Sequence, residues 1–259
     1  MQNNTFSTLF VGQNLIKLLE VDSTNNFIKL LVSNSEPLTE GTVIMADHQF
    51  AGRGQQSNVW HTEPGLNLTF SIYLKPAFLP ITKQFLLNMA VSIGIRNALQ
   101  GFIPEGIKIK WPNDIYHNDR KMGGVLIENI LAGSTFKASI IGIGLNVNQS
   151  VFAPELENRA TSMKGILQAD VNLFQVLAEI CSNIEKQYLR LKSGNYKDLI
   201  TDYVSGLYKF DTLSSYRQNG EIIEGKIIEV TEAGMLVVLV GGEKKEYNFK
   251  EIEFLNHTT

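Results

Sequence analysis

Residues 107–144 read IKIKWPNDIYHNDRKMGGVLIENILAGSTFKASIIGIG, and this stretch decides the fold. Apolar and β-branched residues gather in four short runs that turn residues separate, a pattern typical of consecutive strands. The predicted strands are residues 107–111, 114–117, 122–130 and 135–144, joined by short turns, one of which contains Asn118 and Asp119. The stretch therefore predicts a β-sheet at the centre of the chain.

The chain around this stretch alternates strand and helix patterns as far as about residue 205. Further strands are predicted at residues 15–21, 42–46 and 67–74. Helical spacing of apolar residues predicts helices at 25–32, 81–99 and 173–191, the first with Ser23 as its N-cap. Residues 48–60 are rich in Gly, Gln, Ser and Asn, so we expect a long loop there.

The pattern changes after about Tyr208. Short predicted strands follow at residues 221–230, 235–240, 247–249 and 252–254, with glycine-containing turns between them. About fifty residues form only a marginal independent core, so we expect a small β-barrel that packs on the larger domain.

Composition excludes several classes of protein. The chain has 259 residues, with 23 Lys and Arg against 26 Asp and Glu, for a formal net charge of −3. Bulk attraction to nucleic acid or to an anionic membrane is therefore not the default, and any basic chemistry must be local. The single cysteine, Cys181, excludes an internal disulfide framework and indicates a reducing, cytoplasmic compartment. Neither a secretion signal nor an apolar run of membrane-spanning length is found.

Three motifs are candidates for chemistry. In the first, Gly52-Arg53-Gly54, the glycines allow backbone N–H groups to approach an anion and Arg53 adds a planar donor fork. On pattern alone, an ordinary surface loop is the favoured interpretation. No P-loop, dinucleotide fingerprint or serine-hydrolase elbow is present, and the four histidines lack metal-ligand spacing.

The second motif is KWPND at 110–114, followed by Lys121 and two glycines. A lysine beside glycines can present a charge to an anionic substrate, and Asp114 can orient that lysine or hold Mg²⁺. A β-turn with solvated lysines is an equal alternative. The third motif, Gly142-Ile143-Gly144, ends an apolar strand and indicates either a packed bulge or a ligand against the strand.

Together these segments resemble the biotin protein ligase family. The matching residues are Asp22-Ser23-Thr24-Asn25, Gln49-x-Ala51-Gly52-Arg53-Gly54, Trp60, KWPND at 110–114, Lys121-x-Gly123-Gly124 and Gly142-x-Gly144-Leu145-Asn146. The resemblance covers nearly the whole chain. It implies an α+β fold, with a class II synthetase-like mixed β-sheet flanked by helices over residues 1–207 and an SH3-like β-barrel over residues 208–259.

The resemblance also implies a reaction in two steps. Biotin and ATP, with Mg²⁺, would give biotinyl-5′-adenylate and pyrophosphate, and a lysine of a biotin carboxyl carrier protein or domain would then take the biotin. Lys121 and Arg53 would be the catalytic cations. The implied biotin-binding residues are Ser23, Thr24, Asn25, Gln49, Gly52, Arg53, Gly54, Gln55, Lys121, Gly124, Gly142 and Gly144. Those implied for ATP are Arg53, Trp60, Asn113, Asp114, Lys121 and Asn146, with Asp114 also as a metal ligand.

One departure from the family stands out, because its glycine-rich loop is commonly richer in arginine. Here Gln55, Gln56, Ser57 and Asn58 follow Gly54, which leaves Arg53 as the only charged residue of the loop.

Fourteen residues precede the first predicted strand, so we expect no helix-turn-helix and no DNA binding. A homodimer is possible. The alternative functions are a lipoate protein ligase, which shares the fold and the adenylate chemistry, and a non-catalytic binding module on a degenerate ligase.

Overall fold

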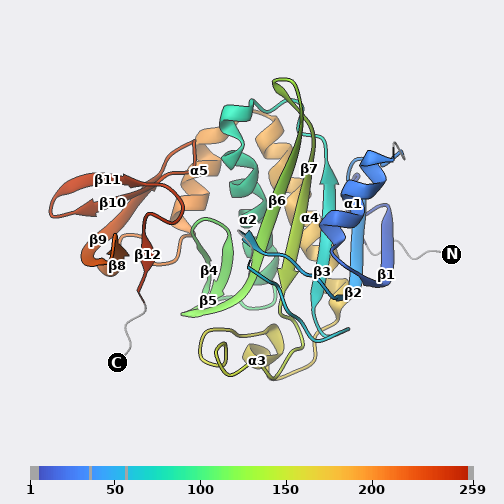
Figure 1. Cartoon of the computed structure of the whole chain (residues 1–259), viewed down its shortest axis with the longest axis horizontal. Coiled ribbons are helices and arrows are strands. Elements are labelled where there is room, and N and C mark those ends of the chain that lie inside the picture. The colour runs from blue at the N-terminus through green and yellow to red at the C-terminus, as the bar shows by residue number, and fades with distance from the viewer. Residues whose placement is uncertain (1–5, 35–36, 56–57, 256–259) are drawn as a thin grey trace.

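The computed structural model describes residues 6–34, 37–55 and 58–255. Seven strands form a mixed sheet in the order β1-β2-β3-β7-β6-β5-β4, where β1 and β2 are parallel and the other neighbours are antiparallel (Figure 1). The strands are β1 (Leu15–Val21), β2 (Val43–Gln49), β3 (Leu68–Leu74), β4 (Ile107–Lys110), β5 (Asp114–His117), β6 (Arg120–Ala132) and β7 (Thr135–Leu145). The predicted strands of the 107–144 stretch are thereby confirmed.

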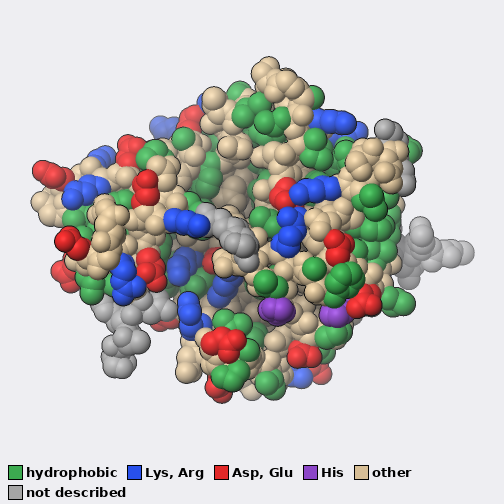
Figure 2. Space-filling model, viewed as in Figure 1, with side chains coloured by type: hydrophobic (Ala, Val, Ile, Leu, Met, Phe, Trp, Pro, Cys, Tyr) green, Lys and Arg blue, Asp and Glu red, His purple; other side chains and the backbone are tan. Residues whose placement is uncertain are grey.

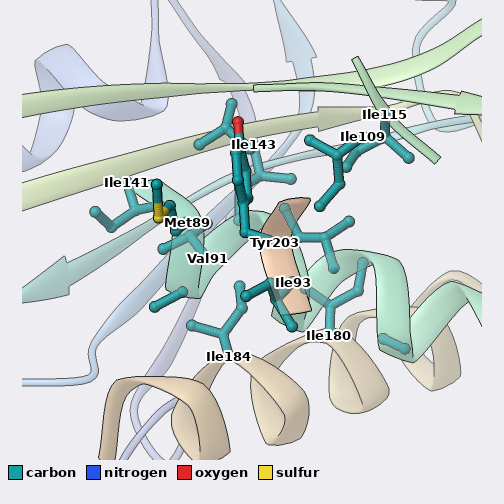
Figure 3. Close-up of a cluster of buried hydrophobic side chains, with 14 of the residues drawn as sticks. Met89, Val91, Ile93, Ile109, Ile115, Ile141, Ile143, Ile180, Ile184 and Tyr203 are labelled. Carbon is teal, nitrogen blue, oxygen red and sulfur yellow. The ribbon is translucent and has the colours of Figure 1, made fainter. Parts of the chain in front are cut away.

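Helices cover the two faces of this sheet unequally. The helices are α1 (Thr24–Ser33), α2 (Phe85–Gln100), α3 (Met163–Leu167), α4 (Leu173–Lys192) and α5 (Tyr196–Ser205), with a 3-10 turn at Ile81–Lys83. Helices α2 and α4 pack on one face, where their isoleucines and valines meet Ile141 and Ile143 of β7 (Figure 3). On the other face, Ile28 of α1 packs against Tyr73 and Ile140. Because α1 is short, it leaves part of its face of the sheet uncovered.

The C-terminal strands form a second sheet. Its order is β11-β10-β9-β8-β12, all antiparallel, from β8 (Ser214–Gln218), β9 (Glu221–Val230), β10 (Leu236–Val240), β11 (Glu243–Tyr247) and β12 (Glu253–Phe254). The buried Trp111 indole ties it to the larger domain, because its Nε1–H donates to the Gly234 carbonyl at 3.0 Å. The fold class expected from the sequence, a mixed sheet with helices and a small β domain, is confirmed.

Several element boundaries differ from those expected. The predicted loop begins two residues later, because β2 continues to Gln49 through parallel pairing with Val21. A strand predicted at residues 247–249 is wrong: β11 ends at Tyr247, and the strand lies before it as the partner of β10. The patterns missed α3, α5 and β8, which are only 5, 10 and 5 residues long. The division at residue 207 stays a prediction.

Cys181 is buried on α4, where burial raises the pKa of its thiol and the nearby Glu185 adds to that rise. Within the described ranges, no helix is long and apolar enough to cross a membrane.

The buried carboxylate of Glu185 anchors the N-terminal segment. It accepts the backbone N–H groups of Leu9, Phe10 and Val11 at 2.7, 2.8 and 2.9 Å. We expect Glu185→Gln to lower the free energy of unfolding by about 1.5–3 kcal/mol, since an amide loses the charge and sets an NH₂ group against backbone donors. Urea unfolding measures this. The control is Glu179→Gln, on the exposed side of the same helix, and equal stabilities for the two variants would contradict the prediction.

Candidate functional site

A cavity of about 460 Å³ lies on the α1 face of the large sheet, beside the C-terminal strands. Its walls come from the start of α1, the end of β2, the loop at 53–60, the 110–114 turn, β6, β7 and residues 249–254. Figure 2 shows Lys and Arg side chains gathered near the middle of this face of the molecule. A protein with a net charge of −3 therefore concentrates cations around one hollow.

The floor of the cavity is made of glycines. Gly124 of β6 lies opposite Gly144 of β7, and Gly142 lies opposite Leu126. A Cβ atom on Gly142 would come within 2.6 Å of the Asn25 Oδ1, and one on Gly144 within 2.4 Å of the Trp60 ring. The third motif is thus a place where other groups approach the strand closely, and any side chain at these positions would fill the cavity.

Buried polar groups that are hydrogen-bonded to one another lie at one end of the cavity. Thr24 donates its backbone N–H and its hydroxyl to Gln49 Oε1, at 2.8 and 3.0 Å. Ser71 Oγ lies 2.7 Å from Thr24 Oγ1 and 2.6 Å from Asn25 Oδ1. Ser23, Thr24 and Asn25 are each only 3% exposed. These groups give the cavity a preorganised set of donors and acceptors suited to a small polar ligand head.

The local sequence explains why these residues meet. Strands β1 and β2 are parallel, so their carboxyl ends lie side by side, and α1 begins directly after β1. Ser23 is the N-cap of α1 by its extended backbone, but its side chain makes no capping bond. Instead, Gln49 caps the Thr24 N–H from the neighbouring strand, which fixes the helix start against the end of β2.

Residues 52–55 and 58–60 form the two arms of a narrow hairpin. The Trp60 N–H donates to the Gly52 carbonyl at 2.9 Å, and the Gly54 N–H donates to the Asn58 carbonyl at 2.7 Å. A Cβ on Gly52 would lie 2.4 Å from the Trp60 carbonyl oxygen, so the glycine is needed for this closure. The Trp60 ring lines the cavity against Gly144, and among the described residues its buried Nε1–H has no hydrogen-bond partner.

The Arg53 side chain extends from this hairpin and pairs with the carboxylate of Glu128. Its Nη1 and Nη2 donate to the two oxygens of Glu128 at 3.1 and 2.7 Å, and Lys29 Nζ reaches the same carboxylate at 2.6 Å. Burial acts to raise the pKa of Glu128, but hydrogen bonds from Lys29, Asn25 and Arg53 outweigh it and lower that pKa. Glu128 is therefore ionised at neutral pH.

Lys121 and Lys110 bring further positive charge to the cavity. Lys121 Nζ forms an ion pair with Asp114 at 2.7 Å. Lys110 Nζ lies 3.1 Å from the Tyr116 hydroxyl, and it sits over the rings of Tyr116 and Phe254. Burial lowers the pKa of Lys110, and Asp114 opposes part of that shift. Both lysines line the cavity, so an anion there meets two point charges besides Arg53.

The structure brings most of the predicted site residues together. Those that line the cavity are Ser23, Thr24, Asn25, Gln49, Arg53, Gly54, Gln55, Trp60, Asn113, Asp114, Lys121, Gly124, Gly142 and Gly144. Gly52 and Asn146 do not line it: Gly52 closes the hairpin, and the Asn146 amide donates to the Thr161 carbonyl at 3.1 Å. Asn113 uses its amide to hold the Val125 carbonyl at 2.5 Å.

Sequence reasoning missed two groups of residues. The first is the pair Glu128 and Lys29, although an acidic residue inside an apolar strand is a recognisable signal, because a half-buried carboxylate needs cations or donors. The second is the C-terminal segment at the cavity edge, namely Phe249, Lys250, Ile252, Glu253 and Phe254. No local pattern marks it, since only packing of the two sheets places it there.

Comparison with known proteins places this geometry in a family. Residues 18–146 match the model of the biotin/lipoate A/B protein ligase family. The bifunctional ligase/repressor BirA of Bacillus spizizenii is 30% identical over 244 residues, which cover 93% of this chain and 74% of that protein. The biotin–[acetyl-CoA-carboxylase] ligase of Mycobacterium tuberculosis is 24% identical over 207 residues, covering 78% of this chain and 75% of that one.

Solved structures agree. The biotin protein ligase of Aquifex aeolicus, solved in complex with biotin and ATP, superposes with a TM-score of 0.78 at 28% identity, covering 93% of this chain and 98% of the other. On the motifs, the cavity and these comparisons, the chain belongs to the biotin protein ligase family.

Proposed function

We propose that this protein activates biotin with ATP and transfers it to a lysine of a biotin carboxyl carrier protein. The observation that carries the proposal is the cavity in which a polar, preorganised end meets Arg53, Lys110 and Lys121 over a glycine floor. The ureido group of biotin has one carbonyl and two N–H groups, which match the donors and acceptors around Thr24, Asn25 and Gln49.

The chemistry requires cations because both reactants are anionic. In the first step, an oxygen of the biotin carboxylate attacks the α-phosphorus of ATP, a P–O bond to the β-phosphate breaks, and pyrophosphate leaves. Arg53 and Lys121 would hold the carboxylate and the α-phosphate together and balance charge that shifts during the reaction. Each cation is paired with an acid, Glu128 or Asp114, which keeps it in place before substrate arrives.

In the second step, the ε-amine of the carrier lysine attacks the biotinyl carbonyl, the C–O bond of the mixed anhydride breaks, AMP leaves, and the nitrogen loses a proton to solvent. Lys121 would stabilise the negative charge that develops on the phosphate as it departs. Trp60, whose ring lines the cavity, would contact the adenine.

Mg²⁺ fits the site as an ion that the nucleotide brings. The described part of the chain contains no cluster of three or more His, Cys, Asp or Glu side chains that could hold a metal. Asp114 offers one carboxylate at the cavity wall. Mg²⁺ is commonly bound by one or two carboxylates together with substrate phosphates, so Asp114 is a sufficient protein ligand. The ion would withdraw charge from the phosphates when bound.

The direct test is incubation with ATP, Mg²⁺, labelled biotin and an apo carrier domain, with label expected on the carrier. Calorimetric titration with biotin and with lipoate separates the nearest alternative, because lipoate lacks a group that would pair with Asn25 and Gln49. Tighter binding of lipoate would reverse the assignment of substrate.

A homodimer stays a prediction, which sedimentation equilibrium tests.

The arginine-poor loop leads to a kinetic prediction. Gln55 lines the cavity, where relatives commonly carry further arginines, so the loop has one cation to retain the adenylate. We expect Gln55→Arg to slow adenylate dissociation about tenfold, which corresponds to about 1.4 kcal/mol of added charge-assisted bonding. A chase of labelled biotinyl-5′-adenylate measures the rate. Gln175→Arg, which adds the same charge on the exposed side of α4, is the control, and equal rates for wild type and Gln55→Arg would refute the idea.

A further inference from the structure

Glu128 forms hydrogen bonds with two residues that line the cavity, Asn25 and Arg53. Its Oε2 accepts from Asn25 Nδ2 at 2.8 Å and from Arg53 Nη2 at 2.7 Å, while its Oε1 accepts from Lys29 Nζ at 2.6 Å and from Arg53 Nη1 at 3.1 Å. It does not line the cavity itself. The carboxylate thus lies behind the site, between the hairpin that carries Arg53 and the helix start that carries Asn25.

The charge balance keeps Arg53 available to a substrate. A lone Arg–Glu pair would be neutral, but Lys29 adds a second cation, so the cluster of Lys29, Arg53 and Glu128 has a net charge of +1. A guanidinium has five N–H donors, and two contacts with Glu128 leave the others for an anion. Bidentate pairing also fixes the plane of the guanidinium group.

The same carboxylate orients the amide of Asn25. The Asn25 Oδ1 accepts from Ser71 Oγ at 2.6 Å, and its Nδ2 donates to Glu128 and, at 3.3 Å, to the Leu126 carbonyl. Without the acceptor on Glu128, one N–H of this 3%-exposed amide would lose its short partner. Asn25 is the group that we place at the head of biotin, so Glu128 reaches both substrate-binding ends.

We propose that Glu128 is a positioning residue, which holds the Arg53 guanidinium towards the reacting carboxylate and phosphate and orients Asn25 at the biotin head, with Lys29 as its permanent counter-ion. The inference rests on the proposed function, since it assigns Glu128 to the same reaction. It differs from a structural role in one respect: the effect of Glu128 on kcat must pass through Arg53, whereas its effect through Asn25 falls on the KM for biotin.

A double-mutant cycle tests that dependence. Glu128→Gln, Arg53→Ala and the double variant are compared by biotin-dependent pyrophosphate exchange, with kcat and KM resolved for ATP and biotin. We expect Glu128→Gln to lower kcat about 10- to 100-fold in the wild-type background, because a misplaced catalytic cation has a cost of this order. In the Arg53→Ala background the same substitution should change kcat less than about twofold, since coupled residues are not additive.

Trypsin supplies a readout that does not require activity. Cleavage after Arg53 should become at least about fivefold faster in ligand-free Glu128→Gln, because the guanidinium is no longer held on a carboxylate. The control is Asp202→Asn, which removes the carboxylate partner of Arg190 at 2.5 Å, away from the cavity. It should leave both measurements unchanged. Glu128→Asp, which keeps the charge but shortens the side chain, should fall between wild type and Glu128→Gln and serves if the amide variant folds poorly.

The outcomes separate the two proposals. Wild-type protein with no biotin-dependent exchange would overturn the proposed function, and this inference with it. Active wild type, together with effects of Glu128→Gln and Arg53→Ala that multiply, would overturn the inference alone. An unchanged rate of cleavage after Arg53 would also overturn it. Non-additive kinetics with faster cleavage would support it.

Discussion

Lys121→Ala is expected to lower biotin-dependent pyrophosphate exchange by about 100- to 1,000-fold while leaving the protein folded, the range found when one electrostatic stabiliser is removed from an active site. Lys121 lines the cavity and pairs with Asp114 at 2.7 Å. Lys110, which also lines the cavity, is held over two aromatic rings on the side of the C-terminal strands, so we expect it not to take the place of Lys121. Radioactive pyrophosphate exchange into ATP measures the effect.

Stability should change little in this variant. The Lys121 side chain is 36% exposed, and ion pairs of that exposure contribute about 0–1 kcal/mol. The matched control is Lys164→Ala, because Lys164 has a side chain 38% exposed and pairs with Asp170 at 2.8 Å, away from the cavity. Normal exchange by Lys121→Ala would reject its catalytic role, whereas loss of exchange in both variants would show that the assay responds to general destabilisation.

Gly142→Ala is expected to weaken biotin binding about 10- to 100-fold. The added Cβ would lie 2.6 Å from Asn25 Oδ1 and 3.0 Å from its Cγ. Asn25 cannot move aside freely, because its amide is bonded to Ser71 and Glu128. Displacing it moves the amide away from the position that we propose for the biotin head, and the loss of one buried hydrogen bond to the ligand, at about 1–3 kcal/mol, corresponds to the expected loss of affinity. Isothermal titration with biotin measures it.

The same methyl group added elsewhere provides the control. Gly165→Ala in α3 would meet Ser162 Oγ only at an ordinary 3.4 Å, and Ala is the better helix former. We expect its biotin affinity to equal that of wild type. Unchanged affinity in Gly142→Ala would show that Asn25 does not contact the ligand head.

Periodicity in the sequence predicted the large sheet well, because its strands are long and apolar. Strand β7, for example, is buried on both faces of the sheet, so apolar residues follow one another along it without alternation. The predictions failed where elements were short or where pairing extended them. Strand β2 reaches Gln49 only because β1 lies beside it, and no residue near Gln49 encodes that partner.

The candidate site was predictable where its residues fall in local motifs. Gly52-Arg53-Gly54, the 110–114 segment and Gly142-Ile143-Gly144 each have an unusual composition that signals close approach or charge. Glu128, by contrast, is marked only by its residue type, and its partners Lys29, Asn25 and Arg53 lie 75 to 103 residues away in the chain. Such pairings depend on which strands and helices pack together.

The sequence by itself predicted the family, through its resemblance, together with the fold class and most of the residues that line the cavity, because motifs and periodicity lie within short segments. The tertiary structure decided how the charges are arranged. It placed Arg53 on Glu128, Lys121 on Asp114 and the C-terminal strands at the cavity edge. The physical reason is that ion pairs act through space over a few ångströms, so the state of each cation depends on neighbours that only the folded chain brings within reach.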